Sequence, residues 1–150
     1  MVQLSVKIKN LDQIQYFFRY FPVRMTKELD VAISRIILRV ESDAKKLAPV
    51  NKQSGGGNLR QSIRSQMTGT ASGMVEVGAD YAEYVHEGTR PHTIVIKSAR
   101  VLANKRTNQI FGKKVMHPGT KPNPFLQAAI DKNEEFINDQ FDKAIQNVLT

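Results

Sequence analysis

The most regular hydrophobic pattern in the chain lies between residues 29 and 47. Apolar side chains recur there with helical spacing: Leu29, Ile33, Ile36, Ile37, Val40, Ala44 and Leu47. This spacing places them on one face of an α-helix of about five turns, with charged residues between them. Pro49 cannot continue a helix, so we expect the helix to end there and to pack its apolar face against a sheet.

The residues before this helix predict two shorter elements. Residues 2–8 alternate apolar and polar side chains, which is typical of a strand with one buried face. Asn10, with Gln13 three residues later, favours the start of a short helix from Leu11 to about Phe21. Pro22 predicts the end of that helix.

Glycines and short apolar runs organise the middle of the chain. Residues 51–57 include three consecutive glycines and predict a flexible loop. Asn58 is expected to cap a short helix that runs to about Ser65. A turn at 69–73 then leads into a short strand at 74–78.

A long arm is expected after these elements. Residues 81–87 favour one or two helical turns, and Gly88 suits the left-handed position that ends them. Residues 90–116 then contain two apolar runs separated by a polar, basic loop at 103–109. We interpret this segment as a hairpin-like β arm that grips another molecule, because its tip has little to bury.

The C-terminal segment predicts one more helix. Residues 117–124 hold three prolines and a glycine, which exclude regular structure. Asn123 followed by Pro124 is a typical helix start, and the apolar spacing that follows predicts a helix nearly to Thr150. The expected fold class is α+β: a single domain, residues 1–150, in which a small antiparallel sheet packs against a long central helix and a C-terminal helix, with the extended hairpin-like arm.

Composition narrows the class of protein. The chain has 150 residues, a net charge of +8 and 41% hydrophobic residues, values that fit one ordinary domain with its own core. It has no cysteine, which excludes disulfides, zinc–thiolate sites and thiol catalysis. The N-terminus lacks an apolar signal core and no long apolar run is present, so we expect synthesis in the cytoplasm and no membrane partner.

Charge is distributed in blocks. Residues 44–75 and 88–130 contain no acidic side chain, whereas residues 76–87 contain four acidic and no Lys or Arg side chains. Folding can mix such blocks into ordinary solvated surface, or they can match an acidic patch on one copy with a basic patch on its neighbour. Nucleic acid is a third partner for the basic blocks. The candidate contact residues are Glu83, Glu87, Arg90, Lys105, Arg106, Lys113 and Lys114.

The sequence contains little evidence for a catalytic, phosphate-binding or metal site. The glycines of 51–57 are not followed by the Lys-Ser/Thr pair of a phosphate-binding loop, and no nucleophile motif is present. A metal site at Glu83, His86 and Glu87 and a small basic hydrolase that uses His86, His92 or His117 stay open as alternatives. We expect no catalytic residue, cofactor or metal.

Three ordered segments carry a family resemblance. They are Leu47-Ala48-Pro49-Val50 with Gly57-Asn58-Leu59-Arg60-Gln61-Ser62-Ile63; Val75-Glu76-Val77-Gly78 with Tyr81-Ala82-Glu83-Tyr84-Val85-His86-Glu87-Gly88-Thr89; and His117-Pro118-Gly119-Thr120-Lys121-Pro122 with Pro124-Phe125-Leu126-Gln127-Ala128-Ala129. In this order the segments resemble the neck, or head–tail joining, family of long-tailed double-stranded DNA phages.

The resemblance implies a structural virion protein. Members of that family form a homo-oligomeric ring in the neck or tail, between connector or head-closure proteins and tail-terminator or tail-tube proteins. Such a ring lines the path of the genome, so non-specific contact with DNA is a further expectation. The rival hypothesis is a basic nucleic-acid-binding module.

Overall fold

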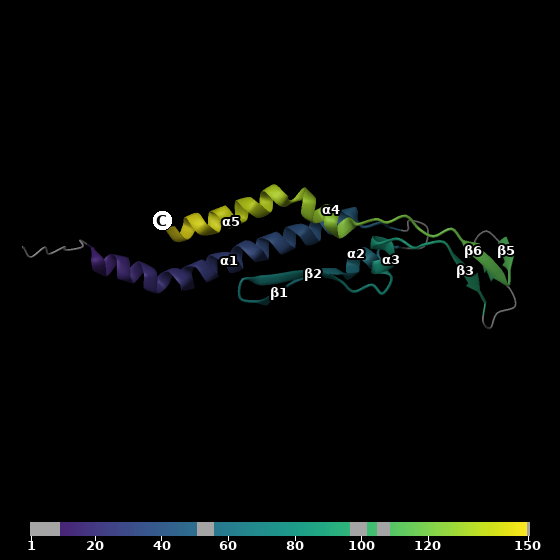
Figure 1. Cartoon of the computed structure of the whole chain (residues 1–150), viewed down its shortest axis with the longest axis horizontal. Coiled ribbons are helices and arrows are strands. Elements are labelled where there is room, and N and C mark those ends of the chain that lie inside the picture. The colour runs from purple at the N-terminus through teal and green to yellow at the C-terminus, as the bar shows by residue number, and fades with distance from the viewer. Residues whose placement is uncertain (1–9, 51–55, 97–101, 105–108, 150) are drawn as a thin grey trace, which may run out of the picture.

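The computed structural model describes residues 10–50, 56–96, 102–104 and 109–149. The protein is α+β, as the sequence predicts, with a long N-terminal helix, small antiparallel sheets and C-terminal helices (Figure 1). The strand expected at residues 2–8 and most of the loop expected at 51–57 lie outside the described residues.

The two helices expected on either side of Pro22 form one helix, α1 (Leu11–Leu47). The prediction of a break was wrong because Pro22 lies at an exposed position, where a proline costs one backbone hydrogen bond but buries no unpaired group. Ring pairs one turn apart, Tyr16 on Tyr20 and Phe17 on Phe21, support the helix around it. Asn10 makes no side-chain cap hydrogen bond and has a left-handed φ of 64°, so the predicted cap is also wrong.

A hairpin lies along one side of α1. It consists of β1 (Ile63–Gly69) and β2 (Ser72–Val77), paired antiparallel with Ile63 opposite Val77. The strand predicted at 74–78 corresponds to β2, but the helix predicted to reach Ser65 is shorter: α2 (Asn58–Ser62) follows Gly57 and gives way to β1. Ile63 is fully buried in the strand, and this burial outweighs the local helical preference.

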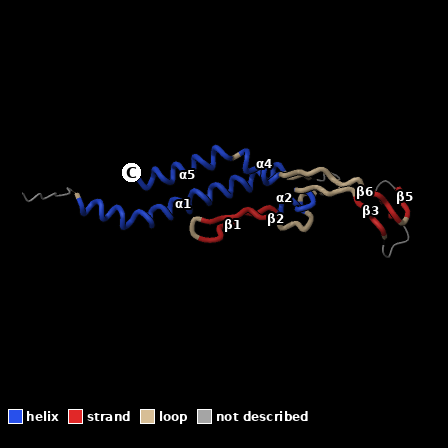
Figure 2. The backbone as a smooth tube through the Cα atoms, in the orientation of Figure 1, coloured by secondary structure: helices blue, strands red, loops and turns tan. Residues whose placement is uncertain are grey.

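The C-terminal helices cover the opposite side of α1 (Figures 1 and 2). The single helix expected there is two helices, α4 (Phe125–Lys132) and α5 (Glu134–Leu149), with Asn133 between them. Pro124, not Asn123, occupies the cap position, and no side-chain cap hydrogen bond forms. α1 is therefore the middle layer between the hairpin and the C-terminal helices.

One hydrophobic cluster joins these layers. Its buried members come from α1 and the residue that caps it, and from α2, β1 and α4: Val40, Ala44, Ala48, Leu59, Ile63, Phe125 and Ala129. Val75, Val77, Ala82 and Val85 pack against it from β2 and from the short helix α3 (Ala82–His86). The cluster lies at the end of α1 from which the arm projects, so it fixes the base of the arm.

The arm contains two antiparallel strand pairs. β3 (His92–Val95) pairs with β6 (Lys114–His117), and β4 (Leu102–Asn104) pairs with β5 (Gln109–Gly112). Figure 1 shows β3, β5 and β6 at the far end of the molecule, away from α1 and α5. This arrangement confirms the predicted hairpin-like arm.

Candidate assembly surfaces

Two glycines shape the point where the arm leaves the helices. Thr89 and Thr120 exchange backbone hydrogen bonds with N–O distances of 3.0 and 3.1 Å. Gly88 and Gly119 precede them with φ angles of 74° and 84°. A Cβ at Gly119 would lie 2.1 Å from the Thr89 carbonyl oxygen, and one at Gly88 would lie 2.5 Å from that of Thr120. The close contact between the two chain segments therefore requires glycine, and the left-handed turn predicted at Gly88 is confirmed.

The arm presents apolar side chains to solvent. Val95, Ile110 and Met116 are 59%, 69% and 68% exposed. None of the described arm residues belongs to the hydrophobic cluster of the helices and hairpin. Backbone pairing holds β3 and β6 together, along with a ring contact between His92 and His117 at 5.1 Å between centroids and a contact from Thr93 Oγ1 to Met116 Sδ at 3.9 Å. Short strands with exposed apolar side chains are a surface suited to binding another chain.

The predicted basic contact residues fall on this arm. Arg90 is exposed shortly before β3, Lys113 is exposed just before β6, and Lys114 is the exposed first residue of β6. Lys105 and Arg106 lie outside the described residues. Within the described ranges, Arg90, Lys113 and Lys114 form no ion pair, so their charges are free for an outside partner.

The predicted acidic contact residues lie at the base of the arm. Glu83 is exposed on α3, and Glu87 follows that helix with a side chain 71% exposed. Glu87 Oε1 lies 2.8 Å from His86 Nδ1, and the His86 ring meets the edge of Phe125 at 5.7 Å. Figure 1 shows α3 near the helices and β6 at the other end of the arm, so Glu83 and the two lysines are separated within one copy.

A buried carboxylate is the feature that the sequence reasoning missed. Asp43 is 1% exposed and accepts hydrogen bonds from Asn133 Nδ2 at 3.0 Å and from Lys46 Nζ and Lys132 Nζ at 3.1 Å. These donors, the Asn133 amide first, hold the pKa of the Asp43 carboxyl well below its ordinary value. The sequence gives one indication of these contacts: Arg39 precedes Asp43 by four residues and Lys46 follows it by three, which are spacings of ion pairs on a helix.

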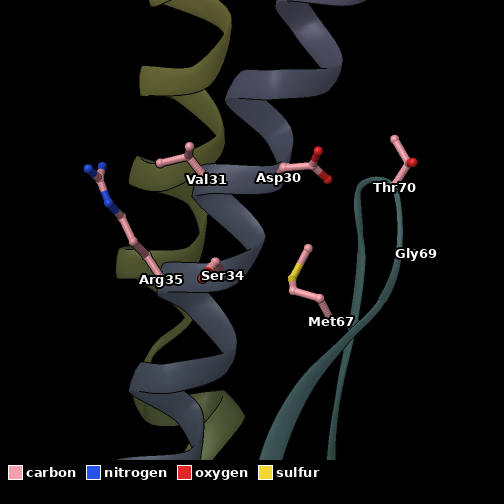
Figure 3. A pocket seen from close by; sticks show the side chains of 7 residues that line it. All are labelled: Asp30, Val31, Ser34, Arg35, Met67, Gly69 and Thr70. Carbon is pink, nitrogen blue, oxygen red and sulfur yellow. The ribbon is translucent and has the colours of Figure 1, made fainter.

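A shallow hollow opens between α1 and the tip of the hairpin (Figure 3). It measures about 720 Å³ and is lined by Asp30, Val31, Ser34, Arg35, Met67, Gly69 and Thr70. Asp30 Oδ1 accepts a hydrogen bond from the Ala71 amide at 2.6 Å, so this carboxylate holds the hairpin turn. Among the described residues that line the hollow, Ser34 and Thr70 carry hydroxyl groups and Asp30 and Arg35 carry charges.

The geometry of the described residues does not support the metal site or the histidine hydrolase left open by the sequence. Among the described residues, no group of three His, Asp or Glu side chains is placed to hold a metal ion. His92 and His117 lie together on the arm, whereas His86 lies on α3 against Phe125. The structure therefore offers exposed surfaces as the candidate sites.

Comparison of the chain with protein-family models, curated proteins and solved structures finds no match. In the described part of the chain, no helix combines the length and the apolar character needed to cross a membrane.

Proposed function

We propose that the chain is a structural subunit of the neck of a long-tailed double-stranded DNA phage. In this proposal many copies form a ring at the head–tail interface, around the path of the DNA. The ring joins connector or head-closure proteins to tail-terminator or tail-tube proteins and performs no reaction. Its place is the virion, after synthesis in the host cytoplasm.

The observation that carries the proposal is the convergence of the three resembling segments. Leu59 and Ile63 from the first segment, Val77 and Val85 from the second, and Phe125 from the third meet in one hydrophobic cluster. The same segments supply both residues of the Thr89–Thr120 bridge and the two glycines that precede them. The motif residues thus build the base of the arm, which supports a family resemblance based on a common scaffold.

The arm supports an assembly role by its composition. It carries exposed apolar side chains and unpaired cations, and its described residues add nothing to the core. α3, which carries Glu83 and is followed by Glu87, lies near the helices, whereas β6, which begins at Lys114, lies at the far end of the arm (Figure 1). A head-to-tail neighbour brings unlike ends together, which is the heterologous contact that closes rings.

Electron microscopy of particles tests the proposal. In a phage whose genome encodes this chain, a stop codon in its gene should give filled heads without attached tails, and the wild-type gene supplied in trans should restore joining. Normal tailed particles without the chain would overturn the proposal. Empty or unassembled heads would place the role at an earlier step and would also contradict it.

Nucleic-acid binding is a second candidate because the arm cations have no acidic partner in the described chain. The expected behaviour is binding to duplex DNA that weakens steeply with salt, since each phosphate contact releases counterions. A Lys113→Gln/Lys114→Gln variant should lose about two phosphate contacts. The slope of the logarithm of the binding constant against the logarithm of the salt concentration should therefore fall by about two. Absence of binding at low salt would remove this candidate without affecting the neck proposal.

A further inference from the structure

The N-terminal end of α1 extends beyond the helix that covers it. α5 ends beside residues 24–28, where Arg24 Nη2 donates to the Asn147 carbonyl at 3.1 Å and Asn147 Nδ2 donates to Glu28 Oε2 at 2.8 Å. Figures 1 and 2 show α1 continuing past the C-terminus. Residues 11–23, here named the overhang, are about 20 Å long at 1.5 Å per residue.

The overhang is apolar around most of its circumference. Its exposed large apolar side chains are Leu11, Ile14, Tyr16, Phe18, Tyr20 and Val23. Its only charged residues are Asp12 and Arg19. A helix with apolar residues on nearly every side is normally buried, and a patch of this kind marks an interaction site.

One face of α1 has coiled-coil spacing along the overhang and into the turn that follows it. Apolar residues alternate at intervals of three and four: Leu11, Ile14, Phe18, Phe21 and Met25. This set, here named the seam, fits the a and d positions of a heptad repeat. The same spacing continues through Glu28, Ala32 and Arg35 to Arg39. Glu28 accepts a hydrogen bond from Asn147 of α5, Ala32 is buried, and Arg39 donates to Asn133 between α4 and α5. The seam is therefore the continuation of the face that the C-terminal helices cover.

We propose that the seam is the docking surface for a second copy of this chain, with the two overhangs packed antiparallel about a two-fold axis at Phe18. In this register Phe18 lies opposite Phe18 and Leu11 opposite Met25, while Ile14 and Phe21 lie within one residue of facing each other. The partner's overhang then follows the face that α5 covers and reaches Met25, beside the end of α5. It extends the existing helix–helix packing over the part of the face that α5 leaves open.

The area of this contact predicts a weak dimer. A buried aromatic side chain removes about 150–250 Å² from water, so a half-exposed one offers on the order of 100 Å². Leu11, Ile14 and Phe18 are exposed, whereas Phe21 and Met25 are only partly so. The seams of two copies therefore give at most on the order of 1,000 Å², the lower limit for a specific interface. We therefore expect dissociation at micromolar concentrations.

This inference does not depend on the proposed function. A two-fold contact pairs the same surface of two copies, whereas a cyclic ring uses two different surfaces. The dimer is thus a state of the free protein in which each copy shields the overhang of the other.

Analytical ultracentrifugation of the full chain tests the pairing. The wild type should show a monomer–dimer equilibrium, and Phe18→Gln should raise its dissociation constant at least tenfold, because the residue occurs twice at the axis. Tyr16→Gln is the matched control: Tyr16 is 66% exposed and Phe18 is 70% exposed, but Tyr16 lies off the seam. A wild type that stays monomeric at about 100 μM, or equal effects of the two substitutions, would overturn the proposal.

Cysteine cross-linking tests the antiparallel register in a chain with no native cysteine. Phe18→Cys should form a disulfide-linked dimer under mild oxidation, because equivalent residues meet at the axis. Leu11→Cys alone should not, but a mixture of the Leu11→Cys and Met25→Cys chains should cross-link. Cross-linking of Leu11→Cys to itself would indicate a parallel pair and contradict the register. The loss of tails in the particle experiment is independent of either result.

Discussion

The Asp43 carboxylate accepts a hydrogen bond from the Asn133 amide at 3.0 Å, and this contact joins the middle of the molecule to its C-terminal helices. Asn133 also donates to the Ala129 carbonyl at 2.8 Å, so the same amide ends α4 and holds α1. Arg39 Nε donates to Asn133 Oδ1 at 3.2 Å. Both buried polar groups therefore have partners, as burial requires.

Replacing the charge at this contact should destabilise the fold. In Asp43→Asn the new amide faces the Asn133 amide and loses its ionic bonds to Lys46 and Lys132, so we expect a loss of about 2–3 kcal/mol in the free energy of unfolding at pH 7. Urea denaturation measures it. Asp142→Asn, an exposed position on α5, is the control and should stay within about 0.5 kcal/mol of the wild type. A smaller loss at Asp43 than at Asp142 would contradict the role assigned to the contact.

The same carboxylate predicts a pH dependence. The donors around Asp43 hold its folded-state pKa far below the unfolded value of about 3.9. Its contribution is therefore fully present above that unfolded value and is lost as pH falls toward the folded value. The difference in unfolding free energy between wild type and Asp43→Asn should shrink progressively below about pH 4. A difference that grows on acidification would show that the carboxylate is not stabilised in the folded state.

The arm junction offers a matched pair of glycine substitutions. Gly119→Ala places a Cβ 2.1 Å from the Thr89 carbonyl oxygen and should break the Thr89–Thr120 bridge, costing about 3 kcal/mol through backbone strain and two lost hydrogen bonds. Gly112→Ala has a similar φ of 81° but meets nothing within 4 Å. It should cost only the strain, about 1–2 kcal/mol.

Hydrogen exchange at single amides separates the two variants. The Thr89 and Thr120 amides should exchange faster in Gly119→Ala and keep wild-type rates in Gly112→Ala, while α1 amides remain protected in both. If the Thr89 and Thr120 amides exchange as slowly in Gly119→Ala as in Gly112→Ala, the arm is held by contacts other than this bridge.

The hydrogen bond between Asp30 of α1 and the hairpin turn can be tested at a single amide. Asp30 Oδ1 accepts the Ala71 amide at 2.6 Å, and Ala71 has a left-handed φ of 48°. Asp30→Ala removes the acceptor, so the Ala71 amide should exchange faster and the unfolding free energy should fall by about 1 kcal/mol. The Ser65 amide, held by Glu41 at 2.9 Å, should keep its rate and serves as the internal control.

The sequence predicts the parts of this fold that depend on repeated local signals. The helical spacing from Leu29 to Leu47, the left-handed Gly88 and the arm follow from periodicity and from glycine geometry. Pro22 and Ile63 mislead because tertiary context outweighs the local rule: one proline is tolerated on an exposed helix face, and burial of Ile63 selects a strand.

The Asp43 contact was beyond sequence reasoning for a different reason. A charged residue on a helix is usually solvated, and nothing in the local sequence announces that Asn133, ninety positions away, will donate to it. The candidate contact residues were visible as charge blocks, but their separation along the arm is a property of the folded chain. Charge pattern thus predicts which residues are available, and the fold decides which of them can meet.

Charge reversal at the two ends of the arm tests contact between copies. Glu83→Lys/Glu87→Lys should reduce joining of heads to tails at least tenfold, because like charges then face Lys113 and Lys114 of the neighbour. Lys113→Glu/Lys114→Glu alone should have a similar effect, and the two pairs combined should restore most of the yield of infectious particles. Rescue of this kind depends on the pairing and not on folding, since the four side chains form no ion pair with one another within a copy. Particle yield in trans-complemented phage measures it, and a combined variant that is worse than either pair alone would rule the contact out.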